Sequence, residues 1–225
     1  MTKYSNLKNN IRTLKPIIVF FILFSIKSYA FANQEYIDRN PLSPDQIRDT
    51  IHNLDLENEE EQKIYYKYLL YFIKTNEGFR PYVEAVYTNE YKVGREPKPI
   101  WKQIIGYGFD MTSPDAKAVW DDVLAGTISF DAALKREIYI TEEQAEELLI
   151  KRVKQYEVAL AKIYYPHWEK FKPNERLSLI DIYFVSGATY IGKGTKIYEN
   201  EIKYSETGDP KFLEAICNEI KNLPE

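Results

Sequence analysis

The sequence is poor in the residues that form cross-links and bind metals. Of its 225 residues, one is cysteine and two are histidine. The single Cys217 excludes an internal disulfide, and its apolar surroundings predict that it belongs to the core that stabilises the fold. His52 and His167 lack Cys, His or Asp neighbours at the spacing of metal ligands, and no phosphate-binding glycine loop is present. The sequence therefore implies no metal and no cofactor.

The apolar run near the N-terminus is too short to span a membrane. Residues 16–26 form a run of 11, whereas a spanning helix needs about 20. Basic residues precede this run, no acidic residue occurs before Glu35, and Ala30-Phe31-Ala32 offers small residues where signal peptidase cleaves. This pattern is typical of a signal peptide at residues 1–32. We expect the mature chain to be secreted or periplasmic, with no membrane attachment after cleavage.

No excess of positive charge remains in the mature chain. Removing the five basic residues of the leader leaves 25 basic and 34 acidic residues, a net charge of about −9. A partner such as nucleic acid or an anionic membrane would require a basic face. The charge balance therefore argues against both kinds of partner.

Turn and capping signals divide the rest of the chain into helices around one segment of different character. Residues 33–58 are expected to be an extension with a short helix beginning at Ser43-Pro44-Asp45, and residues 59–225 to be the main domain. The segment 79–110 mixes glycine, proline, aromatic and β-branched residues, which predicts short antiparallel strands. Helices are predicted at 59–76, 112–124, 141–164, 174–186, 195–204 and 210–222. The expected fold class is α+β, a small antiparallel sheet with a helical bundle.

Acid–base chemistry is indicated by two segments near the predicted strands. The first is Glu77-Gly78-Phe79-Arg80, and the second is Ile104-Ile105-Gly106-Tyr107-Gly108-Phe109-Asp110. Cleavage of a glycosidic bond needs a proton donor and a second carboxylate that activates water or stabilises positive charge on the sugar. Gly78 is expected to stop a helix and to leave Glu77 at its C-terminus. This place suits the donor, because the negative end of the helix dipole and partial burial both disfavour a charged carboxylate.

These segments resemble the active-site signature of the phage-type lysozymes (glycoside hydrolase family 24), including the pesticin-like branch. In that family a Glu-Gly pair ends the first helix, and a Thr-Ile-Gly-Tyr-Gly strand follows. Residues 140–149 are similar to the helix start after the family's sheet, and residues 184–188 and 194–197 resemble two later segments. The motifs occur in the family's order over roughly 70–215. The resemblance implies a lysozyme-like fold over 59–225 and a muramidase that hydrolyses β-1,4 bonds of peptidoglycan.

The resemblance also implies roles for individual side chains. Glu77 matches the general acid. The candidates for the second carboxylate are Asp110, six residues past the family's threonine position as in the pesticin-like branch, then Glu90, and then Glu84. If the enzyme inverts, the two carboxyl groups should lie roughly 6.5–9.5 Å apart. The candidates for substrate contact are Tyr107 and Arg80.

Several residues also permit other interpretations. Ile104 occupies the threonine position and cannot hydrogen-bond water, and Val185 replaces a polar residue of a later motif. These departures favour an alternative, a catalytically inactive lysozyme-like protein that binds glycan or a cell-envelope partner. Asp110 could instead cap the helix that follows it, and Tyr107 could be a core aromatic. A helical interaction protein with an accidental likeness is a third possibility.

Overall fold

The computed structural model describes residues 49–90, 98–124 and 126–221, apart from the side chains of Asn89 and Glu90. The predicted leader 1–32, and the predicted helix start at Ser43, lie outside these ranges. The chain divides into two compact units. Of the described residues, 62–158 form one unit, and 49–61 with 159–221 form the other. The predicted domain 59–225 thus contributes to both units.

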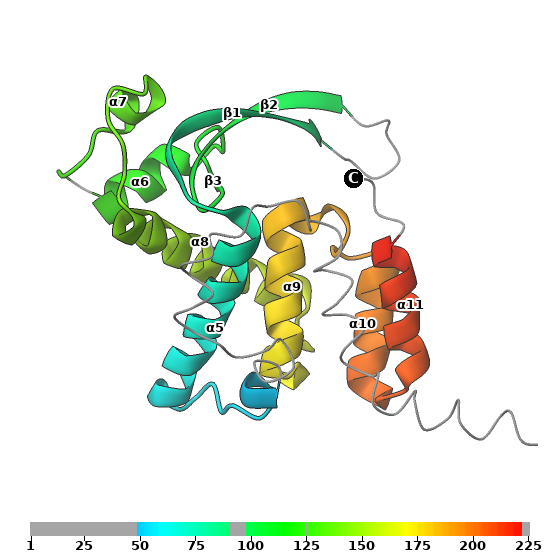
Figure 1. Ribbon diagram of the computed structural model, residues 1–225. Coiled ribbons are helices and arrows are strands. Elements are labelled where there is room, and N and C mark those ends of the chain that lie inside the picture. Colours follow the sequence, from blue (N-terminus) through cyan, green and yellow to red (C-terminus); the bar gives the residue numbers. More distant parts are fainter. Residues whose placement is uncertain (1–48, 91–97, 125, 222–225) are drawn as a thin grey trace, which may run out of the picture. The chain divides into compact units, whose positions relative to one another are not determined.

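The fold is α+β, as predicted, with one three-stranded antiparallel sheet and a majority of helices (Figure 1). The strands are β1 Arg80–Glu90, β2 Lys98–Gly106 and β3 Phe109–Asp110. The α-helices with assigned bounds are α5 Glu59–Glu77, α6 Ala116–Leu124, α7 Phe130–Leu134, α8 Glu142–Ile163, α9 Pro173–Ser186, α10 Lys196–Thr207 and α11 Pro210–Lys221. Residues 49–52 are also helical, and two short 3₁₀ helices occupy Trp168–Lys170 and Gly187–Thr189.

Helix α5 ends where the glycine signal predicted. Its apolar face buries tyrosine, leucine, phenylalanine and isoleucine side chains that recur at helical spacing. The backbone of Gly78 has φ +69°, a left-handed conformation that favours glycine and stops a helix. Its N–H donates to the carbonyl of Lys74 at 3.0 Å. Glu77 is therefore the last residue of α5, directly before the sheet begins.

The start of α8, predicted at 141, is fixed by a capping box. The hydroxyl of Thr141 accepts from the backbone N–H of Gln144 at 3.3 Å. In return, the side-chain oxygen of Gln144 accepts from the backbone N–H of Thr141 at 2.9 Å. This reciprocal pair satisfies two donors at the helix start, and α8 then runs for 22 residues.

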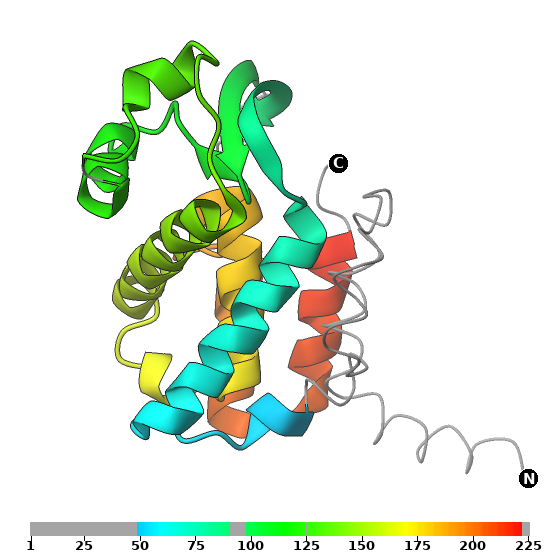
Figure 2. The ribbon, with the colours of Figure 1, turned by 60° about the vertical axis from the view of Figure 1, so that its left-hand side comes forward.

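The sheet has the order β1-β2-β3, and its register determines which residues face each other on neighbouring strands. Glu84 and Ile104 are Cα partners in β1 and β2, and Ile104 and Asp110 are partners in β2 and β3. The register shifts between Arg80 and Glu84, where β1 carries a bulge or irregularity. The turn from β2 to β3 consists of Tyr107 and Gly108. Figure 2 gives a second view of the β1–β2 hairpin.

Between the sheet and α8 the structure departs from the predicted boundaries. Helix α6 begins at Ala116 rather than at 112, because residues 111–115 form turns. Helix α7 was missed by the sequence analysis. It is five residues long, and Ser129 caps it by accepting from the N–H of Ala132 at 3.3 Å. A segment this short carries too few residues for its periodicity to be recognised.

Each unit has its own buried side chains. In the 62–158 unit, Trp120 packs between Phe109 and Phe130, with ring centroids 6.1 and 5.7 Å away. In the other unit, α10 and α11 lie side by side (Figure 1), and Cys217 is a buried free thiol, as predicted. Among the described residues, no helix has the length and apolar character needed to cross a membrane.

Candidate functional site

The proposed acid, Glu77, lies at the junction of α5 and β1 and is partly exposed. The backbone carbonyl of Glu77 accepts a hydrogen bond from the Arg80 guanidinium at 3.0 Å. This contact caps one of the carbonyl groups that a helix leaves without a partner at its C-terminus. The position of the Glu77 backbone is thus defined by both the helix and the first residue of the sheet.

Arg80 is committed to two groups within the protein. Besides the Glu77 carbonyl, its guanidinium contacts the carboxylate of Glu84, with Nε 3.2 Å from Oε2. These contacts give Arg80 a structural task at the bulged start of β1. Its predicted contact with substrate stays a prediction.

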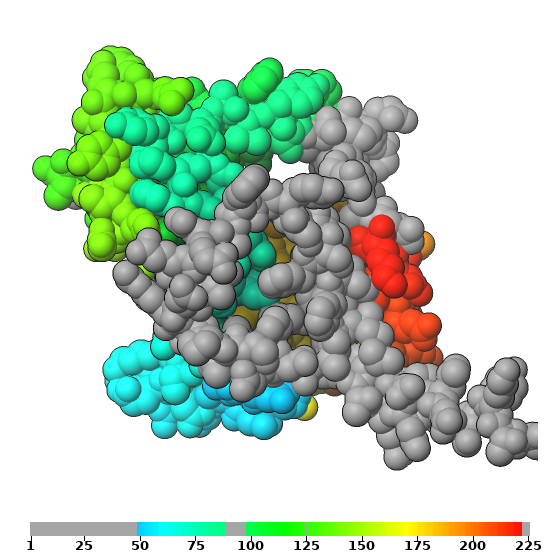
Figure 3. Space-filling model, in the orientation of Figure 1, coloured from blue at the N-terminus to red at the C-terminus, as the bar shows by residue number. Residues whose placement is uncertain are grey.

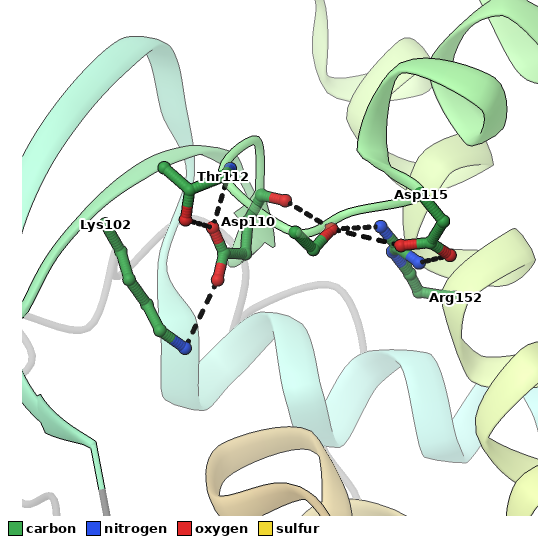
Figure 4. A network of polar contacts seen from close by, with 6 residues as sticks. Lys102, Asp110, Thr112, Asp115 and Arg152 are labelled. Carbon is green, nitrogen blue, oxygen red and sulfur yellow. Dashed lines mark hydrogen bonds and ion pairs between the residues drawn. The ribbon is translucent and has the colours of Figure 1, made fainter.

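Asp110 lies at the end of β3 in a polar network (Figure 4). One carboxylate oxygen accepts from the backbone N–H and the hydroxyl of Thr112, at 2.9 and 2.5 Å. The other oxygen lies 3.2 Å from the ammonium nitrogen of Lys102, and the Asp110 side chain is 23% exposed. The carboxylate therefore helps to form the turn after β3 while part of it stays accessible. Asp110 does not cap the following helix, because α6 begins only at Ala116, and its role as a catalytic carboxylate stays a prediction.

The loop that follows Asp110 is anchored to α8. The Ser113 hydroxyl donates to the Asp110 carbonyl at 2.9 Å and accepts from Arg152 at 2.7 Å. Arg152 also contacts Asp115 at 2.5 Å, and this hydrogen bond lowers the pKa of the Asp115 carboxyl (Figure 4). The Arg152 guanidinium lies over the ring of Phe109, 4.9 Å from its centroid. The network thereby holds the β3 end, and with it Asp110, against the helix.

Ile104 lies directly between two carboxylate-bearing residues of the sheet. Because Cα partners in antiparallel strands project to the same side, the side chains of Glu84, Ile104 and Asp110 leave one face of the sheet in a row. Strands β1 and β2 reach the molecular surface in the upper, green part of Figure 3. The Glu84 side chain is 55% exposed. Two of the three candidates for the second carboxylate therefore flank the position that the resemblance assigns to a threonine.

The third candidate, Glu90, lies far from this row. Its backbone pairs with Lys98 at the far end of the hairpin, and its side chain is outside the described set. Six residues along an extended strand separate it from Glu84, which corresponds to about 20 Å. Glu90 and the row at Ile104 therefore belong to different parts of the sheet, and Glu90 is the less suitable partner for a residue at the start of β1.

Tyr107 lies in the turn between β2 and β3 and is only 5% exposed. Its hydroxyl donates to the carboxylate of Glu142 at 3.0 Å, and its ring packs against Phe79 with centroids 5.5 Å apart. The ammonium of Lys74 lies 4.9 Å from the centroid of the same ring. The packing agrees with the core interpretation of Tyr107 and leaves little of its surface for a sugar.

Two residues that contribute to this region, Lys74 and Glu146, were not predicted from the sequence. Lys74 of α5 is buried, and its ammonium is 2.6 Å from the carboxylate of Glu146 in α8. Lys74 is nine residues from Tyr65 and so lies on the opposite side of the helix from it, and the apolar stripe therefore gave no sign that this lysine is buried. Nothing local indicated Glu146, which is 72 residues away along the chain.

The later family-like motif lies in the other unit. Val185 is near the C-terminal end of α9 and is exposed, and Ser186 donates from its hydroxyl to the carbonyl of Ile182 at 2.7 Å. These residues belong to the unit that contains α10 and α11. The 62–158 unit by itself contains every predicted catalytic and substrate-binding residue.

Comparison with known proteins adds no assignment. No family model, no curated protein and no solved structure matches the chain. Within one unit, a helix-terminal glutamate directly precedes a sheet that presents two further carboxylates on one face, which is a set of groups able to give and take protons.

Proposed function

We propose that this chain is an exported muramidase that hydrolyses β-1,4 glycosidic bonds of peptidoglycan. The ordered sequence segments that resemble the phage-type lysozymes support the proposal, together with the α+β fold. Peptidoglycan or a related glycan is the partner that follows, and no cofactor is needed. Secretion or delivery to the periplasm would bring the enzyme to this substrate.

The observation that carries the proposal is the pairing of Ile104 with Asp110. In the pesticin-like pattern, the second carboxylate follows the threonine position by six residues. Here residues 104 and 110 are Cα partners across the β2–β3 turn, so that spacing places both side chains on one face of the sheet. Glu77 enters the same unit immediately before β1. The six-residue spacing in the sequence thus corresponds to two residues that face each other across β2 and β3.

In the proposed reaction, the carboxylic acid of Glu77 donates its proton to the glycosidic oxygen as the bond from that oxygen to the sugar C1 breaks. A water molecule forms the new bond to C1, and the Asp110 carboxylate accepts the proton that the water loses. The products are two shorter glycans, and proton exchange with solvent returns both carboxyl groups to their starting forms. Thr112 and Lys102 orient the Asp110 carboxylate through their contacts with its two oxygens.

The proposal is tested by replacing Glu77 with Gln in the mature chain. Glu77→Gln keeps the side-chain size but has no acidic proton to transfer, so release of reducing sugars from purified peptidoglycan should fall by at least about 100-fold. The melting temperature should stay close to that of the wild type. Glu147→Gln is a matched control, because Glu147 is an exposed carboxylate in the same unit. Equal hydrolysis by wild type and Glu77→Gln, or no hydrolysis by the wild type, would contradict the proposal.

A second candidate is an inactive protein of the same kind that binds glycan. Ile104 favours it, because a hydrocarbon side chain between two carboxylates offers no group that positions a water molecule. This candidate predicts that the mature chain sediments with insoluble peptidoglycan and releases no reducing sugars from it. Hydrolysis that depends on Glu77 would reject it.

A further inference from the structure

Lys74 is a buried charge one helical turn before the proposed acid. Its side chain is 5% exposed, and its ammonium lies 2.6 Å from the Glu146 carboxylate. Burial of a charge is unfavourable unless the charge is paired, so this contact restrains where the end of α5 can lie. Lys74 and Glu77 are three residues apart and occupy neighbouring positions on the helix. A restraint on Lys74 is therefore also a restraint on the backbone that carries Glu77.

The same turn of α8 also contacts the sheet. Tyr107, in the β2–β3 turn, donates to Glu142, and its ring lies beneath the Lys74 ammonium. Next to it, Gly106 packs so closely on α8 that an added Cβ atom would lie 2.9 Å from the Cβ of Ala145. Three successive contacts, from Glu142, Ala145 and Glu146, thus join the first turns of α8 to the sheet and to α5.

We propose that Lys74, Glu146 and Tyr107 form a positioning lock that fixes the end of α5 against the β2–β3 turn. Lys74 acts as a positioning residue in this lock, since it sets the place of Glu77 relative to the strands that carry Ile104 and Asp110. The catalytic part of this inference rests on the proposed hydrolysis. The structural part, that these contacts order the helix end, does not depend on it.

The lock predicts a specific pattern of kinetic effects. Lys74→Met keeps the apolar stem of the side chain and removes the charge, and the partly exposed Glu146 carboxylate can then turn to water. Loss of the restraint should lower kcat by about 10- to 100-fold, because small displacements of a catalytic group have effects of this size. KM should change by less than about twofold, since Lys74 and Glu146 have no assigned contact with substrate and the buried Tyr107 keeps little surface for one. Lys74→Arg keeps the charge and should restore most of kcat.

Lys151→Met is the control for removal of an ion pair as such. The Lys151 ammonium is also 2.6 Å from a carboxylate, that of Asp122 in the same unit, but the Lys151 side chain is 42% exposed, against 5% for Lys74. The kcat and KM of Lys151→Met should equal those of the wild type. Should Lys74→Met and Lys151→Met behave alike, or should Lys74→Arg be as slow as Lys74→Met, Lys74 is not a positioning residue.

Amide hydrogen exchange tests the lock without any activity. The Gly78 N–H, which donates to the Lys74 carbonyl, should exchange about tenfold faster or more in Lys74→Met, whereas amides within α6 should be unchanged. Unchanged exchange at Gly78 would overturn the lock. A wild-type chain that hydrolyses no peptidoglycan would reject the proposed function and the catalytic role of Lys74 together, while the exchange result would still decide the structural part.

Discussion

Ile104 and Asp110 are Cα partners across β2 and β3, and their side chains project from the same face of the sheet. The turn at Tyr107 and Gly108 produces this pairing from a sequence separation of six. A hydroxyl at position 104 would therefore lie on the same side as the Asp110 carboxylate. Replacing Ile104 by threonine therefore tests whether a hydroxyl at this position assists the reaction.

Ile104→Thr should raise the rate of peptidoglycan hydrolysis. The new hydroxyl can hydrogen-bond the water that Asp110 activates, and an increase of roughly tenfold is expected, below the effect of a preorganised donor. Initial rates of reducing-sugar release give the measurement. Ile104→Val is the matched control, because valine has the shape of threonine without its hydroxyl. Equal rates for the Thr and Val variants would show that no water is positioned there.

The identity of the second carboxylate is decided by single substitutions. Asp110→Asn should reduce hydrolysis by at least about 100-fold, since an amide cannot accept the proton from water. Glu84→Gln should change the rate by less than about threefold. Asp110→Asn should also lower the free energy of unfolding by about 1 kcal/mol, because the contact with Lys102 loses its charge. If Glu84→Gln is the slow variant instead, Glu84 is the partner of Glu77.

Two glycine substitutions separate backbone strain from close packing. Gly78 and Gly106 have similar positive φ values, +69° and +61°. Nothing lies within 4 Å of a Cβ added at Gly78, whereas a Cβ at Gly106 would meet Ala145 at 2.9 Å. Gly78→Ala should lower the free energy of unfolding by about 1 kcal/mol through backbone strain. Gly106→Ala should lower it by the same strain and by about 1–3 kcal/mol more, because the added methyl group overpacks the contact with α8. Urea unfolding measures both, and equal losses would contradict the close contact with α8.

A buried carboxyl in the other unit predicts that stability depends on pH. Glu201 of α10 is 5% exposed. Its burial chiefly, and the negative charge of the nearby Glu175 in α9 to a smaller extent, raise its pKa from 4.5 to about 8. Tyr164, Tyr204 and Cys217 also lie within electrostatic reach of Glu201. In the native chain Glu201 thus keeps a proton at neutral pH that the unfolded chain has released. The free energy of unfolding should therefore fall as pH rises from about 4.5 to about 8, by up to roughly 1 kcal/mol per pH unit from this group.

Glu201→Gln removes this proton linkage and provides the test. The variant should gain stability over the wild type progressively between pH 5 and pH 8, because glutamine stays neutral in both states. Glu199→Gln, an exposed neighbour in α10, should show no such gain. Urea unfolding at three pH values gives the comparison. A constant difference between Glu201→Gln and the wild type would exclude a protonated Glu201.

The helical part of the fold followed closely from the sequence, and the site did so only in part. The end of α5 and the start of α8 were predicted to within one residue, because each depends on side chains within one turn. Helix α10 continues to Thr207, three residues past its predicted end, since Gly208 rather than an earlier residue stops it. For Tyr107, the alternatives of substrate contact and core packing could not be separated along the chain, because its partner Glu142 comes from another element.

The sequence by itself determined where α5 ends and where α8 begins, that a small antiparallel sheet follows α5, and that a helix-terminal Glu77 precedes several carboxylates. Only the tertiary structure decided that Ile104 lies between Glu84 and Asp110, that Glu90 is far along the hairpin, and that Lys74 is paired with Glu146. Caps, turns and periodic patterns depend on interactions within a few residues. Register and buried ion pairs join residues that are distant along the chain, so they exist only once the strands and helices have packed.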